Sequence, residues 1–255
     1  THQRTWGTKN VERKSSSCRS MATLLIGTTL LGATHGGVRW TAQKGHGVQK
    51  YIVDRLMKGL KFGGTFVEFG CADGMTNSMT YPFEQIGWTG LCIEPNAHAF
   101  AKARLVRKNT INALITSTAR NFTYAEMAGS CAQVSGIVEF YSPEFHKIMR
   151  KCRNQGMLKR RTTLPGVPLE GLLAQHAMTS VTWISIDCEG CEADFIGSFN
   201  FTHYDVQIVN YEPNSVARRP KTEKTILTAL HQHGFQEMTQ GGLVDRLFTR
   251  HSSWR

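Results

Sequence analysis

Short apolar segments alternate with amphipathic segments along most of the chain. Apolar runs typical of buried strands recur at residues 66–69, 91–93, 111–115, 181–186 and 205–211. Apolar residues at helical spacing predict helices over 47–60, from Pro95 to about Arg107, over 168–176, around 195–196 and around 226–230. Strands that alternate with helices in this way predict an α/β fold built on a mostly parallel sheet.

Two regions depart from this alternation. Residues 122–168 are irregular, and only 134–141 is expected to form a strand there. Near the end of the chain, 235–238 and 243–249 flank Gly241-Gly242 and predict a closing antiparallel hairpin. The irregular region is the one long insertion available to cover a site on the sheet.

The first predicted strand runs directly into a glycine-containing loop, Glu68-Phe69-Gly70-Cys71-Ala72-Asp73-Gly74. Gly70 allows a sharp turn and the close approach of a ligand, because it has no Cβ. A dinucleotide fingerprint would need glycines at 72 and 75, where the chain has Ala72 and Met75. The loop therefore favours a ligand without phosphates, and its Glu-x-Gly-x-x-x-Gly pattern is similar to the first motif of S-adenosylmethionine-dependent methyltransferases.

The second predicted strand ends at Glu94-Pro95-Asn96, about 20 residues after the loop. A carboxylate at this place suits the two hydroxyls of a ribose, because it can accept a hydrogen bond from each. Pro95 is expected in the first turn of the following helix.

Three stretches together resemble the FkbM-type methyltransferase family. They are Gly87-Trp88-Thr89-Gly90, Cys92-Ile93-Glu94-Pro95-Asn96 and the run from Ser185 to Glu192, and the resemblance covers roughly residues 49–248. It implies a Rossmann-like class I methyltransferase fold, with a mostly parallel seven-stranded sheet and a C-terminal antiparallel hairpin. It also implies S-adenosylmethionine as cofactor and O-methylation of a sugar, lipid-linked or small-molecule hydroxyl.

The resemblance and the loop chemistry give one set of expected cofactor-binding residues. They are Glu68, Gly70, Cys71, Ala72, Asp73, Gly74, Asn77, Glu94, Pro95, Thr116 and Asp187. Thr116 follows the third predicted strand, where this fold usually meets the adenine ring. The family usually has Gln-Asp where this chain has Gln49-Lys50, so any role of that acid is absent here.

Three carboxylates are expected to converge at the ends of the fourth and fifth strands: Asp187, Glu189 and Glu212. One of them can serve as the base that activates an acceptor hydroxyl. The three together also suit a hard divalent ion, to which the sequence does not commit. The structural alternative is that Asp187 only orients the cofactor and Glu189 caps the next helix.

The chain has 255 residues and a net charge of +11, concentrated at its start. The first fifty residues hold eight Lys and Arg against one acid, Glu12. This predicts a basic arm over 1–46 and a methyltransferase domain over 47–255. The arm's composition favours an organellar, mitochondrial location over the cytoplasm or a secretory lumen. It also supports an alternative function, a catalytically silent accessory subunit anchored in a larger assembly. An apolar run over 21–33 is too short to span a bilayer.

The chain has seven cysteines, and several of them lie in predicted buried elements. This favours free thiols in a reducing compartment over a disulfide framework. Cys188 and Cys191 are interpreted as small residues flanking Glu189-Gly190. Two Asn-Phe-Thr sequons, at Asn121 and Asn200, matter only in a secretory lumen.

A basic cluster lies inside the irregular region. It comprises Lys147, Arg150, Lys151, Arg153, Lys159, Arg160 and Arg161. The simpler interpretation is a solvated face; the alternative is a lid that recognises an acidic small-molecule acceptor. Nucleic acid is not an expected partner.

Overall fold

The computed structural model describes residues 48–49, 52, 63–213, 220–238 and 245–250, which all belong to one compact unit. The expected basic arm, the apolar run at 21–33 and most of the helix expected over 47–60 lie outside these residues. Within the described residues, no helix has both the length and the apolar character needed to cross a bilayer.

A seven-stranded mixed sheet carries the fold. Its strand order is β10-β11-β9-β8-β1-β2-β3, with neighbours hydrogen bonded. The strands are β1 (Thr65–Phe69), β2 (Thr89–Ile93), β3 (Thr110–Ile111), β8 (Trp183–Ile186), β9 (Ile208–Tyr211), β10 (Gln236–Glu237) and β11 (Arg246–Thr249). From β3 to β9 every pairing is parallel, whereas β11 is antiparallel to both β9 and β10. The expected C-terminal hairpin is therefore confirmed.

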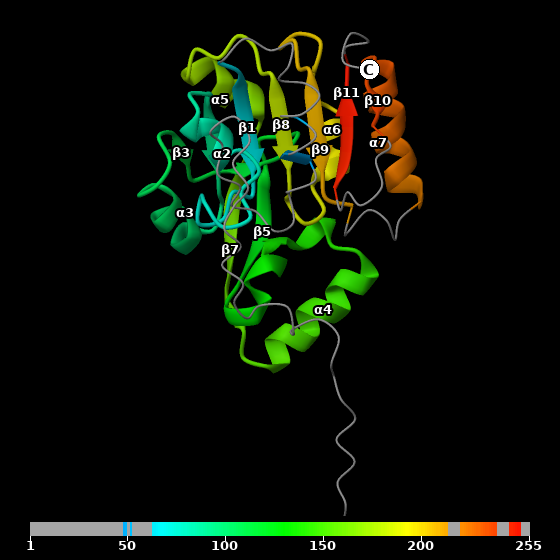
Figure 1. Ribbon diagram of the computed structural model, residues 1–255. Coiled ribbons are helices and arrows are strands. Elements are labelled where there is room, and N and C mark those ends of the chain that lie inside the picture. The colour runs from blue at the N-terminus through cyan, green and yellow to red at the C-terminus, as the bar shows by residue number, and fades with distance from the viewer. Residues whose placement is uncertain (1–47, 50–51, 53–62, 214–219, 239–244, 251–255) are drawn as a thin grey trace, which may run out of the picture. The chain divides into compact units, whose positions relative to one another are not determined.

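Both faces of this sheet are buried, which explains why its central strands are mostly apolar rather than regularly alternating between apolar and polar residues. Along β1, Phe66 packs on one face with Trp88 and Trp183, whereas Val67 and Phe69 face the other core. Helices α5 (Leu169–Gln175), α6 (Glu192–Ile196) and α7 (Pro220–Gln232) contribute to that second core. Figure 1 shows β1, β8, β9 and β11 side by side, with α7 near the β10–β11 edge.

The irregular region is a second structural layer rather than a loop. It forms a four-stranded sheet of order β4-β7-β5-β6, with strands β4 (Leu114–Ile115), β5 (Asn121–Met127), β6 (Gly136–Ile137) and β7 (Leu158–Val167). Between β6 and β7 lie the 3₁₀ turn Val138–Phe140 and helix α4 (Pro143–Asn154). The strand expected over 134–141 was thus wrong except at Gly136–Ile137. The sequence does contain a signal for the start of α4. Ser142 caps the helix by accepting from the Phe145 N–H, and Pro143 follows it in the first turn.

Two further expectations around β2 and β3 were wrong. Helix α3 spans Ala97–Ala103 and begins after Asn96, whose side chain accepts from the N–H groups of His98 and Ala99. Pro95 therefore precedes the helix rather than sitting in its first turn. The single strand expected over 111–115 is split between β3 and β4 in different sheets. The Asn112 side chain donates to the carbonyls of Glu94 and Pro95 at this crossing.

The interpretation of the cysteines as a reduced set is contradicted. Disulfides join Cys71 to Cys92, Cys131 to Cys152, and Cys188 to Cys191. Every cysteine of the described residues is therefore bridged. Cys71 follows β1 and Cys92 lies in the neighbouring strand β2, whereas Cys131 lies in the 3₁₀ helix Gly129–Val134 and Cys152 in helix α4. Sequence position alone does not reveal either proximity.

Candidate functional site

A cavity of about 870 Å³ opens at the carboxyl ends of β1, β2, β8 and β9. This is where open α/β sheets bind their ligands. The loop from Gly70 to Asp73 forms part of one wall, and the second layer contributes another through Tyr124, Glu126 and Gln133. The expectation that the insertion covers the site is confirmed by this lining.

The glycine loop is shaped by close backbone contacts. Gly70 has φ +73°, and a Cβ added there would lie 1.9 Å from the carbonyl oxygen of Asp187. Gly74 has φ +81°, and its Cβ would meet Ala103 and the side chain of Arg107. The loop packs against Asp187, which follows β8, on one side and against helix α3 on the other. Only glycine fits at both of these contacts.

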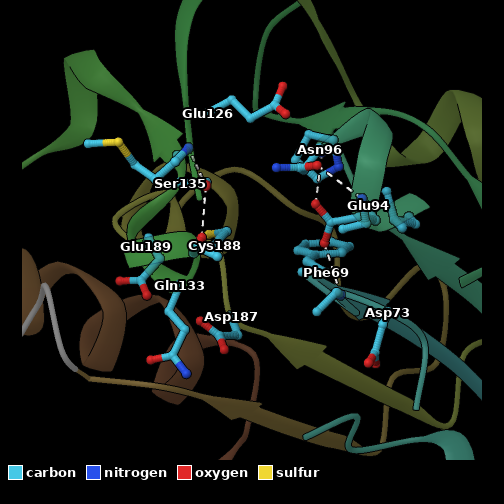
Figure 2. Close-up of a pocket in the computed structure, with 18 of the residues that line it drawn as sticks. Phe69, Asp73, Glu94, Asn96, Glu126, Gln133, Ser135, Asp187, Cys188 and Glu189 are labelled. Atoms are coloured by element: carbon cyan, nitrogen blue, oxygen red, sulfur yellow. Dashed lines mark hydrogen bonds between the residues drawn. The ribbon is translucent and has the colours of Figure 1, made fainter. Parts of the chain in front are cut away.

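Glu94 is the carboxylate best placed for a ribose. It is buried, and its two oxygens accept from the N–H groups of Ala72 (2.9 Å) and Asn96 (2.8 Å). Burial raises its pKa to about 7, against the lowering effect of these two bonds, and the nearby Glu68 raises it slightly further. Each oxygen keeps a lone pair that can accept from a hydroxyl in the cavity. Figure 2 shows Glu94 and Asn96 together on one side of the cavity.

Glu68 lines the cavity, but its carboxylate is occupied by the segment that follows the loop. It accepts from the Met79 N–H (2.6 Å), the Ser78 hydroxyl (2.8 Å) and the Thr80 hydroxyl (2.6 Å). The buried Arg107 adds an ion pair at 3.2 Å. Glu68 therefore holds the segment from Ser78 to Thr80 in place beside the glycine loop.

Arg107 is the centre of this buried network, and its role was not expected from the sequence. Its guanidinium pairs with both Glu68 and Glu84 and donates to the carbonyl of Gly74. It also lies 5.2 Å from the ring centre of Phe66. The result is a fully paired buried charge, the condition under which such a group is tolerated.

The three expected catalytic carboxylates do converge. Asp187 follows β8 and Glu212 follows β9, and their N–H groups donate to Phe69 and Ile186, each on the neighbouring strand. One oxygen each of Asp187, Glu189 and Glu212 lies within 4.8 Å of the others. In Figure 2, Asp187 and Glu189 lie across the cavity from Glu94. The arrangement suits a general base, and its oxygen donors also match a hard divalent cation.

The electrostatics of this cluster favour proton uptake. The pKa of Asp187 lies well above its ordinary value, first because the surrounding protein desolvates the carboxylate, although its side chain stays accessible from the cavity, and then because of Glu212, Glu189 and Asp245. Glu189 has φ +57°, in the left-handed region that non-glycine residues rarely adopt. Such a backbone often marks a functional position.

The cavity collects most of the expected site residues. Those that line it are Glu68, Gly70, Ala72, Asp73, Asn77, Glu94, Pro95, Asp187, Glu189 and Glu212. Cys71, Gly74 and Thr116 do not line it. Cys71 is bridged to Cys92, and the Thr116 hydroxyl donates to the Thr118 carbonyl. Leu114 and Ile115 take the place in the lining where Thr116 was expected.

One carboxylate of the site escaped sequence reasoning. Asp245, just before β11, lines the cavity and accepts from the Asn210 side chain at 2.8 Å. Asn210 in turn accepts from the indole N–H of Trp183 at 2.7 Å. These buried hydrogen bonds connect β8, β9 and the start of β11 to the carboxylate cluster. No motif in the sequence predicts them.

The basic cluster is divided by the structure. Lys159 lines the cavity, whereas Arg160 is paired at 2.7 Å with Glu126, the residue opposite it on β5. The remaining members lie on α4 and β7 and do not line the cavity. Lys159 is thus the member of this cluster that borders the cavity.

The donor set fits S-adenosylmethionine. Glu94 offers two acceptor positions for ribose hydroxyls, the Gly70–Asp73 backbone borders the same space, and the apolar Leu114 and Ile115 flank it. The crevice beside such a loop, at the carboxyl edge of an α/β sheet, is a common binding place for a nucleoside-containing cofactor.

The model of the methyltransferase FkbM domain matches residues 68–237, and the chain belongs to this family. No curated protein matches the chain. The family confirms the resemblance drawn from the three sequence stretches, and it implies an α/β class I methyltransferase fold and general use of S-adenosylmethionine.

Proposed function

We propose that this chain is an S-adenosylmethionine-dependent O-methyltransferase that acts on a hydroxyl of a sugar, a lipid-linked or another small-molecule acceptor. One observation carries the proposal. Glu94 and the Asp187–Glu189–Glu212 cluster face the same cavity from different strand ends. One side can hold the cofactor's ribose, while the other can receive a proton.

The division of roles follows from the positions of the residues. Glu94 and the Gly70–Asp73 backbone would hold the cofactor, which supplies an electrophilic methyl group when bound. A carboxylate of the cluster would take the proton of the acceptor hydroxyl and so make its oxygen the nucleophile that methyl transfer requires. The rest of the rate enhancement comes from orientation, because the cavity holds both partners together.

Two roles of the carboxylate cluster are open to a direct test. If a carboxylate acts as the base, transfer continues in the presence of a chelator. If activity is lost with a chelator and restored by Mg²⁺, the cluster works through a bound cation that acidifies the hydroxyl.

An accessory subunit without activity is the second candidate, motivated by the basic start of the chain. That candidate expects a cavity filled by side chains, and the open volume of about 870 Å³ supports the enzyme instead.

An acidic acceptor group would meet Lys159, and the remaining wall of the acceptor side is rich in carboxylates.

The proposal is tested by release of S-adenosylhomocysteine from S-adenosylmethionine in the presence of a panel of monosaccharides, glycolipids and small alcohols. We expect acceptor-dependent release that the Glu212→Gln variant lowers at least tenfold in kcat, while cofactor affinity is retained. The matched control is Glu144→Gln on α4, outside the cavity. Cofactor binding without turnover on any acceptor, equally in both variants, would favour the accessory subunit.

A further inference from the structure

Two N-glycosylation sequons lie in the described residues, Asn121-Phe122-Thr123 and Asn200-Phe201-Thr202. In each, the asparagine is exposed, whereas the phenylalanine is buried with 1% and 0% of its surface accessible. The phenylalanines anchor the two segments to the core and leave the acceptor amides at the surface. Glycans require this placement, because they are bulky and hydrophilic.

The cysteines supply an independent observation about the compartment. All six cysteines of the described residues are paired in three disulfides. Structural disulfides form and persist in oxidising compartments and are rare in the reducing cytosol. N-glycans are added in the lumen of the secretory pathway, which is also an oxidising compartment. The sequons can therefore be modified in the same compartment in which the disulfides form.

The local structure leaves both asparagines able to react. The Oδ1 of Asn200 accepts from the N–H of His203 at 3.0 Å, which leaves its Nδ2 available. No hydrogen bond of the Asn121 side chain is found among the residues that the structure describes. Neither acceptor nitrogen is therefore held by the fold.

Glycans at these positions would leave the cavity open. Asn200 lies in the segment before β9, which contacts the amino end of β8 through the Val181 N–H and the Tyr204 carbonyl. The cavity lies at the opposite, carboxyl ends of these strands. Asn121 alternates along β5 with Phe122 and Tyr124, so its side chain lies on the other face from Tyr124, which lines the cavity.

We propose that this chain folds in an oxidising secretory lumen and carries N-linked glycans at Asn121 and Asn200. The donor is an oligosaccharide on a lipid pyrophosphate. A bond forms between the asparagine Nδ2 and the sugar C1 as the bond from C1 to the pyrophosphate oxygen breaks. The amide nitrogen loses one proton, and the lipid pyrophosphate leaves. This inference does not depend on the methyl-transfer reaction.

The glycans are tested on the full chain, expressed behind a cleavable signal peptide in eukaryotic cells. We expect two glycans that peptide N-glycosidase removes, converting residues 121 and 200 to aspartate as seen by mass spectrometry. Thr123→Ala and Thr202→Ala should each remove one glycan. Thr123→Ser and Thr202→Ser keep the sequons and serve as matched controls for folding. Secreted, folded protein without glycans would overturn this half of the proposal.

The compartment is tested by comparing that protein with the same chain made in the cytosol. Thiol labelling after denaturation should find the six described cysteines blocked in the secreted form and free in the cytosolic form. We expect the cytosolic form to melt at a lower temperature, because it lacks three cross-links. Equal melting temperatures, with free thiols in the cytosolic form, would contradict an oxidising compartment.

Discussion

The disulfide between Cys71 and Cys92 fastens the glycine loop to β2, two residues before Glu94. The same loop reaches Glu94 again through the Ala72 N–H, which donates to its carboxylate. The covalent and hydrogen-bonded links together hold both expected cofactor contacts in one rigid corner of the cavity.

Removing this disulfide should therefore weaken both stability and cofactor binding. The double variant Cys71→Ser/Cys92→Ser should lose about 3 kcal/mol of unfolding free energy in denaturant titrations. Cys131→Ser/Cys152→Ser is a matched control, because its disulfide spans the same sequence separation of 21 residues. Both variants should lose similar stability, but only the first should bind S-adenosylmethionine more weakly. Equal cofactor affinity in the two variants would show that cofactor binding does not depend on the Cys71–Cys92 disulfide.

The buried Arg107 should be among the most sensitive positions of the fold. Arg107→Met leaves the buried Glu68 and Glu84 without their cation, and we expect a loss of about 3–5 kcal/mol in unfolding free energy. Arg104→Met, at an exposed position one turn earlier, should change stability by less than about 0.5 kcal/mol. Urea titration of both variants checks this, and a near-neutral Arg107→Met would refute the network.

Gly70 should tolerate no side chain. Gly70→Ala places a methyl group against the carbonyl oxygen of Asp187, in addition to the cost of a positive φ. Gly87→Ala carries the positive φ (+101°) but has nothing within 4 Å of the added Cβ. Thermal melts should therefore show a clearly larger loss for Gly70→Ala. If the two variants melt alike, the loop does not pack against Asp187 as described.

Cofactor affinity should depend on pH through Glu94. Its pKa of about 7 means that it takes up a proton as the pH falls through neutrality. Only the ionised carboxylate accepts from both ribose hydroxyls, so affinity should fall below pH 7 by up to about tenfold per pH unit. 5′-Methylthioadenosine is the suitable probe, because it keeps the ribose and lacks the amino-acid group that also titrates near neutrality.

The Glu94→Gln variant separates the effect of Glu94 from any other pH-dependent change in binding. Its binding should be weaker at pH 8 and nearly independent of pH between 6 and 8. A variant that keeps the wild-type pH slope would assign the titration to another residue.

The main sheet could be predicted because its strands are buried on both faces. Residues 66–69 and 181–186 are mostly apolar for that reason, and acidic residues in or directly after them line the cavity. The second layer could not be predicted in this way. In β7, Arg160 and Arg161 interrupt the apolar pattern, and the strand is stabilised by its pairing with β5 instead.

The remaining errors have the same physical origin, since they concern contacts between distant segments. Cys71 and Cys92 resemble any small buried residues until the strands bring them together. Arg107 looks like a surface charge at the end of a helix, and only tertiary packing surrounds it with Glu68 and Glu84. Asp245 joins the site because β11 inserts beside β9.

Calorimetric titration of S-adenosylmethionine into the wild type and Glu94→Ala tests the central claim most directly. Hydrogen bonds to a charged group are worth about 1.5–3 kcal/mol, so Glu94→Ala should weaken saturable binding by roughly 10- to 150-fold. Glu170→Ala on α5, outside the cavity, is the control and should bind like the wild type. Circular dichroism of both variants verifies that they are folded. Absence of binding to the wild type, or equal binding to a folded Glu94→Ala, would contradict the assignment of this cavity to the cofactor.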